Sequence, residues 1–252
     1  MSILLTNDDG IYAEGLIALR RELATIAETI VFAPSTERSG VAHAVTLYSP
    51  IAVEKVTVDG KVAYAVEGTP VDCVKIAVKG MGKTKPDLVL SGINSGPNVG
   101  IDIIYSGTVS AAVEAAIMGI PAVAISLAES QSPDFSYAAR FAAELAATLL
   151  QDRFLPPGIL LNVNVPAVPE DQIKGVAVTK QSRSCYGEHF ERKRVSPDKM
   201  FFTISGKLAD LSEPPDVDIT ALANNYISIT PVHFDLTHHP TIEALLRRKI
   251  GK

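Results

Sequence analysis

Cysteine is scarce in this sequence, and long apolar runs are missing. The two cysteines, Cys73 and Cys185, form neither a CxxC pair nor a cysteine–histidine pattern, which argues against a zinc site. Two free thiols suit a reducing compartment. No stretch of roughly eighteen apolar residues occurs, so we expect no membrane-spanning helix. The opening segment 1–10 lacks the basic start and apolar core of a signal peptide, and we therefore expect a cytoplasmic protein.

Positive charge is also limited. The 23 lysines and arginines stand against 28 aspartates and glutamates, which gives a formal net charge of −5. Clustered basic side chains supply most of a protein's affinity for a nucleic-acid backbone, so we expect no nucleic-acid polymer as a partner. A small phosphorylated ligand is compatible with this charge. The 252 residues, of which 47% are hydrophobic and 20% charged, suit one large folded domain rather than a disordered chain.

Apolar runs and helical periodicity alternate through the first two thirds of the chain. We expect strands at 3–6, 30–33, 87–91, 122–127 and 159–165, and a hairpin that joins 55–58 to 62–66 around Asp59-Gly60. We expect helices at 16–26, 72–78, 111–118 and 137–149, with Val109, Val113, Ala116 and Ile117 on one face of the third. Repeated strand–helix units predict an α/β fold with a doubly wound, mostly parallel sheet of the Rossmann-like kind.

The last third has a different pattern, with short alternating runs and few helix signals. We expect 201–205 to pair with 176–181, and we expect a strand at 226–230. Short helices are predicted at 218–222, with Asp218 as a cap, and at 241–249, entered through His238-His239. Without a clear linker, we predict a single domain over 1–252 with a β-rich C-terminal extension from about 176 to 252.

Two adjacent carboxylates, Asp8 and Asp9, follow the first predicted strand. In a doubly wound sheet the carboxyl ends of the strands form the ligand crevice. Like charges side by side need a cation or strong hydrogen-bond donors to remain ionised together, and carboxylate oxygens favour hard cations such as Mg²⁺ or Mn²⁺. Taken alone, the doublet fits a solvated turn equally well.

Two further polar segments follow predicted strands at the same edge. The segment 91–100 contains three glycines together with Asn94 and Asn98, and the segment 35–40 contains Arg38 and Ser39. Each one alone would be an ordinary surface loop. Because both follow strands that end beside the first one, a shared ligand site explains them more economically.

A fourth segment, Ser106-Gly107-Thr108, directly precedes a predicted helix. Serine in this position is often only an N-cap. The free N–H groups and the positive end of the helix dipole also make such a start an anion site, and glycine allows close approach. The two interpretations are compatible.

Six motifs in order give the sequence a resemblance to a known family. They are TNDDG at 6–10, RSG at 38–40, GTPVDCV at 68–74, SGINSGPNVG at 91–100, YSGTVSAA at 105–112 and SITP at 228–231. Together they resemble the SurE family of survival proteins, which are 5′/3′-nucleotidases, over nearly the whole chain. None of the motifs would suffice alone.

The resemblance implies a metal-dependent enzyme that hydrolyses nucleoside 5′-monophosphates, with 3′-monophosphates and short polyphosphate as further substrates. It implies one divalent metal ion per subunit, Mg²⁺ or Mn²⁺, and a homodimer or homotetramer that exchanges C-terminal segments. Carried over by motif position, the metal ligands are Asp8, Asp9, Ser39 and Asn94. The phosphate pocket maps to Asn98, Ser106, Gly107 and Thr108.

The implied mechanism assigns Asp8 and Asp9 the catalytic role, with one of them orienting the attacking water. Three alternatives compete with it. A phosphatase of the haloacid dehalogenase type needs carboxylates spaced as DxD, whereas here they are adjacent. A dinucleotide-dependent oxidoreductase needs GxGxxG after the first strand, which instead ends in Asn-Asp-Asp-Gly. A nucleotide-binding regulator without catalysis would not need the metal ligands.

The segment 180–199 is basic and carries the aromatic residues Tyr186 and Phe190. One interpretation is a mobile flap that stacks on a base and attracts anions. The other is a solvated hairpin tip or a subunit contact. His43 lies near Ser39 in the sequence, and we expect it, like Cys73, to have a structural role. Cys185 is interpreted as an incidental loop residue.

Overall fold

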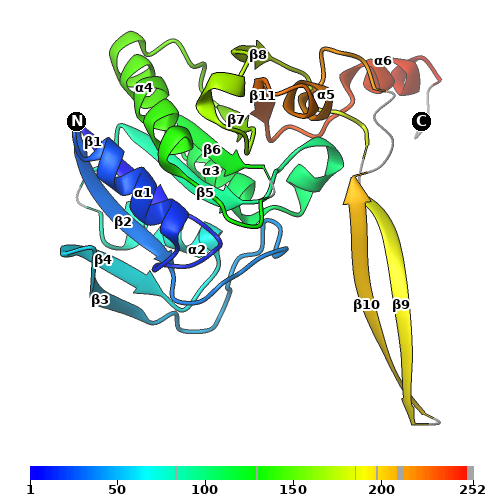
Figure 1. The fold of residues 1–252 in the computed structure, drawn as a ribbon, viewed down its shortest axis with the longest axis horizontal. Coiled ribbons are helices and arrows are strands. Elements are labelled where there is room, and N and C mark those ends of the chain that lie inside the picture. Colours follow the sequence, from blue (N-terminus) through cyan, green and yellow to red (C-terminus); the bar gives the residue numbers. More distant parts are fainter. Residues whose placement is uncertain (83, 129, 185, 197, 209–212, 249–252) are drawn as a thin grey trace.

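A nine-stranded, mostly parallel sheet forms the centre of the protein in our computed structural model, which describes residues 1–82, 84–128, 130–184, 186–196, 198–208 and 213–248. The strand order is β3-β4-β2-β1-β5-β6-β7-β11-β8 (Figure 1). The strands are β1 (Ser2–Thr6), β2 (Glu28–Pro34), β3 (Val53–Val58), β4 (Lys61–Val66), β5 (Leu88–Ser95), β6 (Ala122–Leu127), β7 (Ile159–Val165), β8 (Val176–Val178) and β11 (Ile227–His233). This sheet confirms the predicted α/β fold class.

The chain reverses its direction of travel across the sheet at β1. From β1 it passes to β2 on one side, and it later returns to β5, which pairs in parallel with the other side of β1. Ligand crevices in open α/β sheets form at such switch points, beyond the carboxyl ends of the strands. The fold therefore places a crevice between the residues that follow β1 and those at the end of β5.

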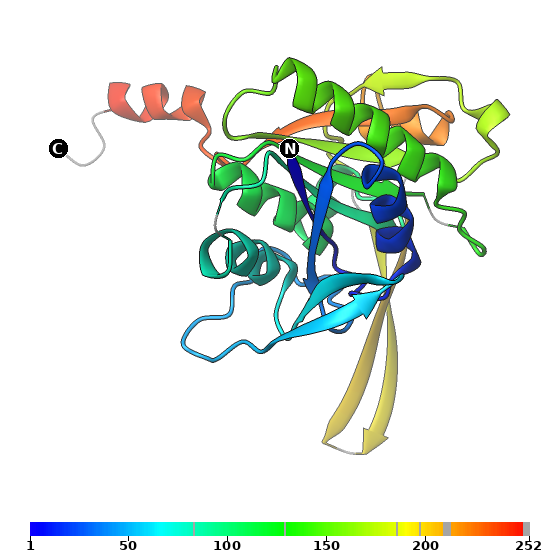
Figure 2. The same cartoon turned by 90° about the vertical axis from the view of Figure 1, so that its left-hand side faces the viewer.

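Helices cover both faces of the sheet. Figure 2 shows α1 (Glu14–Leu23) and α4 (Ser136–Asp152) on one side, with α2 (Pro70–Lys75) and α3 (Gly107–Ile117) on the other. Neighbouring residues of β1 face opposite cores: Ile3 and Leu5 pack in the first, and Leu4 packs in the second. Each fully buried leucine of this kind contributes about 1.5–3 kcal/mol to stability. Burial on both faces explains why the inner strands are almost continuously apolar.

The close packing of α1 against β5 requires a glycine. A Cβ atom at Gly15 would lie 2.1 Å from the backbone oxygen of Ile93, so any larger residue would push the helix off the strand. The strand itself extends to Ser95, with a cis peptide bond between Gly92 and Ile93. Asn94 therefore lies on β5, whereas the sequence predicted that it lies in a loop. The short apolar run 87–91 gave no signal for this continuation.

Our prediction of which residues form the buried face of α3 is partly wrong. Val109 is buried, but Ile117 is 48% exposed, and the charged residue Glu114 is buried instead. Glu114 is buried because it has two basic partners, described below, which a count of apolar residues does not detect. The helix ends as predicted, since Gly119 follows it in the left-handed region at φ 71°.

The C-terminal third confirms the β-rich extension but corrects its pairing. Strand β10 (Lys199–Leu208) pairs with β9 (Tyr186–Ser196) in a separate hairpin, which projects from the body (Figure 1). The predicted pairing of 201–205 with 176–181 is wrong, because β8 instead pairs in parallel with β11. A hairpin between neighbouring segments closes a shorter loop and loses less chain entropy than the pairing we predicted.

Two helices lie in this third. Helix α5 (Asp218–Ala223) confirms the predicted short helix, but Val217 occupies the N-cap position. The Asp218 carboxylate instead accepts N–H bonds from Gly100 at 2.9 Å and Ser182 at 2.9 Å, so it ties two distant loops together. Helix α6 (His239–Arg247) begins at the predicted entry, and 249 lies outside the described residues.

Three short helical turns complete the described elements: a π-helical turn at Ile76–Gly80, which continues α2, and 3₁₀ helices at Gly100–Ile104 and Glu170–Gln172. Within the described ranges, every helix is too short or too polar to cross a bilayer.

Candidate functional site

A cavity of about 660 Å³ opens at the carboxyl edge of the sheet, at the switch point beside β1 and β5. Most of the residues predicted for a metal and phosphate site line it: Asp8, Asp9, Ser39, Asn94, Asn98 and Ser106. The remaining two, Gly107 and Thr108, contact Asp8 from the start of α3. Four segments that are distant in the sequence therefore meet in one place, as the sequence predicted.

The turn after β1 is stabilised by Asn7, a residue to which the sequence analysis assigned no role. Asn7 is fully buried, and its side chain donates to the backbone oxygen of Gly10 at 2.9 Å and accepts from the Gly10 N–H at 3.2 Å. These two bonds fix the backbone on either side of Asp8 and Asp9. The adjacent carboxylates are thus held by a rigid turn rather than by a solvated one.

Asp8 is the more buried and more firmly held of the two aspartates. Its side chain accepts a hydrogen bond from the Thr108 hydroxyl, and a Cβ atom at Gly107 would lie 2.8 Å from its Oδ2. Burial raises the pKa of Asp8, although the Thr108 hydroxyl and the backbone N–H groups of Thr108 and Gly107 act to lower it. The positive end of α3 is therefore directed at this carboxylate.

Asp9 is partly buried and has fewer donors. The Ser95 N–H donates to its Oδ2 at 3.3 Å. Burial, together with the negative charge of Asp8, raises the pKa of Asp9 to about 6. Two carboxylates in this arrangement repel each other, and a bound cation would remove the repulsion. The electrostatics of the pair therefore favour a cation beside it.

Ser39 and Asn94 add neutral oxygens. The Ser39 hydroxyl donates to Glu37 Oε1 at 2.7 Å, which leaves the lone pairs of its oxygen for another partner. The Asn94 side chain donates from Nδ2 to the Gly96 oxygen at 2.8 Å, which leaves its Oδ1 as an acceptor. Among the residues that the structure describes, no three His, Cys, Asp or Glu side chains cluster as metal ligands do. A cation here would need two carboxylates plus neutral oxygens, a set that suits Mg²⁺ or Mn²⁺.

Asn98 is held by asparagines that the sequence analysis missed. Its Nδ2 donates to Ser126 Oγ at 2.7 Å, and its backbone oxygen accepts from Asn162 Nδ2 at 2.8 Å and Asn164 Nδ2 at 2.9 Å. The Asn98 N–H in turn donates to Asn164 Oδ1 at 2.8 Å. Two asparagines spaced by one residue within the apolar strand β7 were the signal for this support, because buried amides need partners.

The start of α3 has the predicted N-cap. Ser106 Oγ accepts from the Val109 N–H at 3.0 Å, and Ser106 also lines the cavity. We expected Arg38 near the crevice. Its backbone N–H donates to the backbone carbonyl oxygen of Asp8 at 2.7 Å. The loop that carries Ser39 is thereby attached to the aspartate turn.

Outside the cavity, the described residues of the basic segment 180–199 lie partly on the body and partly on the projecting hairpin. Lys180 forms an ion pair with Asp216, and Gln181 donates to the Gly100 oxygen at 2.9 Å. The two interpretations of this segment, a flap over the substrate and a solvated tip or subunit contact, both stay predictions. Cys73 is fully buried as expected, and burial raises the pKa of its thiol, whereas Cys185 lies outside the described residues.

Comparison with known proteins agrees with this architecture. The family model described as "Survival protein SurE" matches residues 3–188. A relative from Syntrophus aciditrophicus, named "5'-nucleotidase SurE", is 46% identical over 97% of this chain and 92% of its own length. A relative of the same name from Alkaliphilus metalliredigens is 44% identical over the full length of both chains.

A solved structure is also similar. The crystal structure of the SurE protein from Aquifex aeolicus superposes with a TM-score of 0.86 at 35% sequence identity, covering 99% of this chain and all of the other. Sequence, family model and fold thus agree over nearly the whole length. On these grounds the chain belongs to the SurE family.

Proposed function

We propose that this protein hydrolyses the phosphate ester of nucleoside 5′-monophosphates, releasing the nucleoside and inorganic phosphate. The observation that carries the proposal is the convergence of Asp8 and Asp9 with Ser39 and Asn94 in one cavity of a SurE-family chain. Relatives that match it over nearly their full length are named 5′-nucleotidases.

The site is proposed to hold one divalent cation, Mg²⁺ or Mn²⁺, through Asp8, Asp9, Ser39 and Asn94. The raised pKa of Asp9 and the neutral oxygens beside it support this donor set. When bound, such a cation neutralises charge on the phosphoryl oxygens and lowers the pKa of a bound water.

The two aspartates have different proposed roles. Asp8 is oriented by Thr108 and by the start of α3, so it serves as the fixed anchor. Asp9 has the Ser95 N–H at 3.3 Å and faces the cavity, so it is free to accept a hydrogen bond from the attacking water. Phosphoryl transfer depends mainly on positioning and charge neutralisation, so this proposal needs no covalent nucleophile.

The phosphate is proposed to lie against Asn98 and the start of α3. Ser106 lines the cavity there, while the N–H groups of Gly107 and Thr108 also act on Asp8. These N–H groups would therefore interact with both the Asp8 carboxylate and the phosphoryl oxygens. Because Asn98 is fixed by β6 and β7, its position is set before any ligand arrives.

The test is a phosphate-release assay with AMP and GMP, as 5′- and 3′-monophosphates, in the presence of Mg²⁺ or Mn²⁺. We expect Asp9→Asn to lower kcat by at least about a hundredfold, as loss of a group that acts on the transition state does. Asp152→Asn, an exposed carboxylate at the end of α4, is the matched control and should behave as the wild type. Near-normal turnover by Asp9→Asn would remove Asp9 from the mechanism. Nucleotide binding by the wild type without phosphate release would instead favour the regulator alternative.

A further inference from the structure

The loop that carries Ser39 is long and irregular, yet it is attached at many points. Residues 35–52 contain no helix or strand between β2 and β3. Loops of this length without secondary structure are uncommon in compact domains and are usually functional. The position of Ser39 therefore depends on what holds the rest of the loop.

Backbone bonds attach the loop on both sides of Ser39. The Arg38 N–H donates to the backbone oxygen of Asp8 at 2.7 Å, and the Ala42 N–H donates to the backbone oxygen of Tyr105 at 3.0 Å. Ala42 has a φ of 52°, a conformation that residues with a side chain rarely adopt. Such a conformation persists only where the surroundings impose it, so the contacts that follow Ala42 are part of its support.

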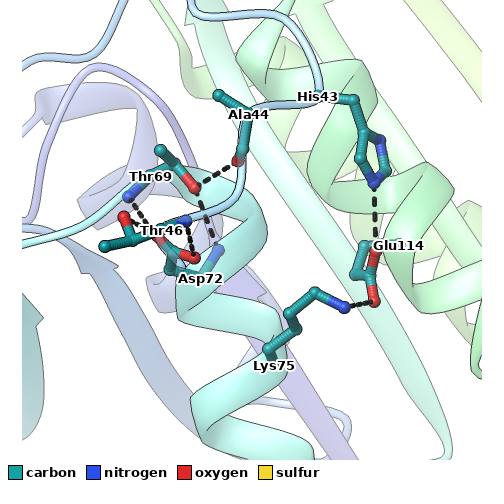
Figure 3. A network of polar contacts seen from close by, with 7 residues as sticks. All are labelled: His43, Ala44, Thr46, Thr69, Asp72, Lys75 and Glu114. Atoms are coloured by element: carbon teal, nitrogen blue, oxygen red, sulfur yellow. Dashed lines mark hydrogen bonds and ion pairs between the residues drawn. The ribbon is translucent and has the colours of Figure 1, made fainter. Parts of the chain in front are cut away.

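Asp72 accepts hydrogen bonds from the part of the loop that follows Ala42 (Figure 3). Its Oδ1 accepts from the Thr46 N–H at 3.0 Å, and its Oδ2 accepts from the Thr46 hydroxyl at 2.6 Å and from the Thr69 N–H at 2.9 Å. The Thr69 hydroxyl donates to the Ala44 oxygen at 2.8 Å. Asp72 is only 1% exposed, and its carboxylate thus joins the loop to the start of α2 through charge-assisted bonds.

Glu114 makes a second connection from α3 (Figure 3). Its two oxygens lie 3.0 Å from His43 Nε2 in the loop and 2.6 Å from Lys75 Nζ on α2. The same helix begins with the residues that surround the phosphate side of the cavity. The network therefore links the loop that carries Ser39 to both helices on this face of the sheet.

We propose that Asp72 is a positioning residue that holds the loop 38–48 in the geometry in which Ser39 faces Asp8 and Asp9. Asp72 does not line the cavity, and it acts through Thr46. This inference rests on the proposed function only for its consequence in metal binding. Its structural part, the attachment of the loop, can be measured separately.

The experiment uses the full chain and two pairs of variants. Asp72→Asn replaces an acceptor oxygen by an NH₂ group, which cannot accept from Thr46 or Thr69. Thr46→Val removes one hydroxyl at constant shape, and Thr46→Ser restores it. Asp87→Asn is the matched control, because Asp87 also accepts a backbone N–H, from Ser2 at 2.8 Å, but at the opposite edge of the sheet.

Two quantities are measured for each variant: Mn²⁺ affinity by electron paramagnetic resonance, and hydrogen exchange of the Ala42 and Thr46 amides. Loss of a hydrogen bond to a charged group lowers the fraction of chains with the loop attached, so we expect Asp72→Asn and Thr46→Val to bind Mn²⁺ roughly threefold to tenfold more weakly. Both amides should exchange faster in these variants. Thr46→Ser and Asp87→Asn should match the wild type.

Each outcome decides the inference. Unchanged Mn²⁺ affinity and unchanged exchange in folded Asp72→Asn or Thr46→Val would overturn it, as would equal losses in Asp87→Asn. If Asp72→Asn does not fold, the Thr46→Val and Thr46→Ser pair gives the same decision. If the wild type neither binds Mn²⁺ nor releases phosphate, the proposed function fails, and the exchange measurement still tests the attachment of the loop.

Discussion

Asp8 and Asp9 are neighbours in the chain but lie in different surroundings. Asp8 is enclosed by Thr108 and Gly107 at the start of α3, whereas Asp9 faces the cavity with one backbone donor. The difference follows from the turn after β1, which Asn7 fixes through Gly10: in this turn Asp8 lies against the start of α3, and Asp9 lies beside Ser95 at the end of β5. Their proposed division into a fixed anchor and a residue that contacts water follows from this geometry.

Gly107 is the residue at which this geometry is most easily disturbed. In Gly107→Ala, the new Cβ atom would lie 2.8 Å from Asp8 Oδ2 and 3.1 Å from Pro70 Cγ. We expect Asp8 to be displaced, kcat/KM to fall by more than about tenfold, and stability to fall by about 1–3 kcal/mol from overpacking. Nucleotidase kinetics and urea unfolding measure the two effects.

Gly80→Ala is the matched control for that substitution. A Cβ atom at Gly80 would lie no closer than 3.6 Å to Ile76, which is ordinary van der Waals contact. Its kinetics should equal those of the wild type. Full activity in Gly107→Ala would mean that the position of Asp8 against α3 is not important for turnover.

At the scale of elements, α2 and α3 are joined by a buried charge. Glu114 is 3% exposed and bonds Lys75 and His43. Burial acts to raise the pKa of Glu114, but the hydrogen bonds from His43 and Lys75 outweigh it and lower that pKa. A carboxyl group whose pKa is depressed in the folded state stabilises the fold above its unfolded pKa of about 4.3, and this contribution is lost as the pH falls through the folded value.

Glu114→Gln tests this charge. At pH 7 we expect the variant to be about 1–3 kcal/mol less stable than the wild type, because Lys75 loses its charged partner. The difference between the two should shrink as the pH falls from the unfolded pKa of about 4.3 through the lower pKa of the folded state, where the wild-type carboxyl becomes protonated. Urea unfolding at a series of pH values measures it, and a difference that stays constant down to acid pH would contradict the account.

The elements also show how far the sequence could predict this fold. The parallel strands and their helices were predictable, because strands buried on both faces are apolar runs between turn signals. The meeting of four segments at the cavity was predictable, because three of them follow predicted strands and the fourth precedes a helix at the same edge, although Asn94 proved to lie on β5 itself. The residues that support the site were not predictable in the same way. The partners of Asn7 and Asp72 lie in a turn or far along the sequence. Asn162 and Asn164 in an apolar run did signal buried amides, but the sequence does not show that their partner is Asn98.

At the scale of the whole molecule, two parts extend from the body. The hairpin β9–β10 and helix α6 project from the central fold (Figures 1 and 2). Alternate residues of β10, Met200, Phe202 and Ile204, lie on one face and are 43–64% exposed. Exposed apolar side chains of this kind mark surfaces that contact other molecules, so we propose that the hairpin contributes to a homo-oligomer.

Shortening the hairpin separates this proposal from the flap interpretation. Because Glu188 pairs with Gly206, replacing 189–205 by Asn-Gly keeps the base of the hairpin and removes Phe190 together with the exposed apolar residues of β10. We expect the variant to form a smaller assembly by light scattering and to retain its KM for AMP. A KM raised by about fivefold or more at unchanged mass would instead support the flap, since aromatic stacking is worth roughly 1–3 kcal/mol per base.

The central claim is that the side chains of Asp8 and Asp9 jointly hold one divalent cation at the switch point of the sheet. Anomalous diffraction from crystals soaked in Mn²⁺ tests it most directly. The account predicts one manganese peak in the cavity within coordination distance of both carboxylates and the Asn94 oxygen. A cavity without a peak, in crystals whose Asp8 and Asp9 side chains point away from each other, would contradict it.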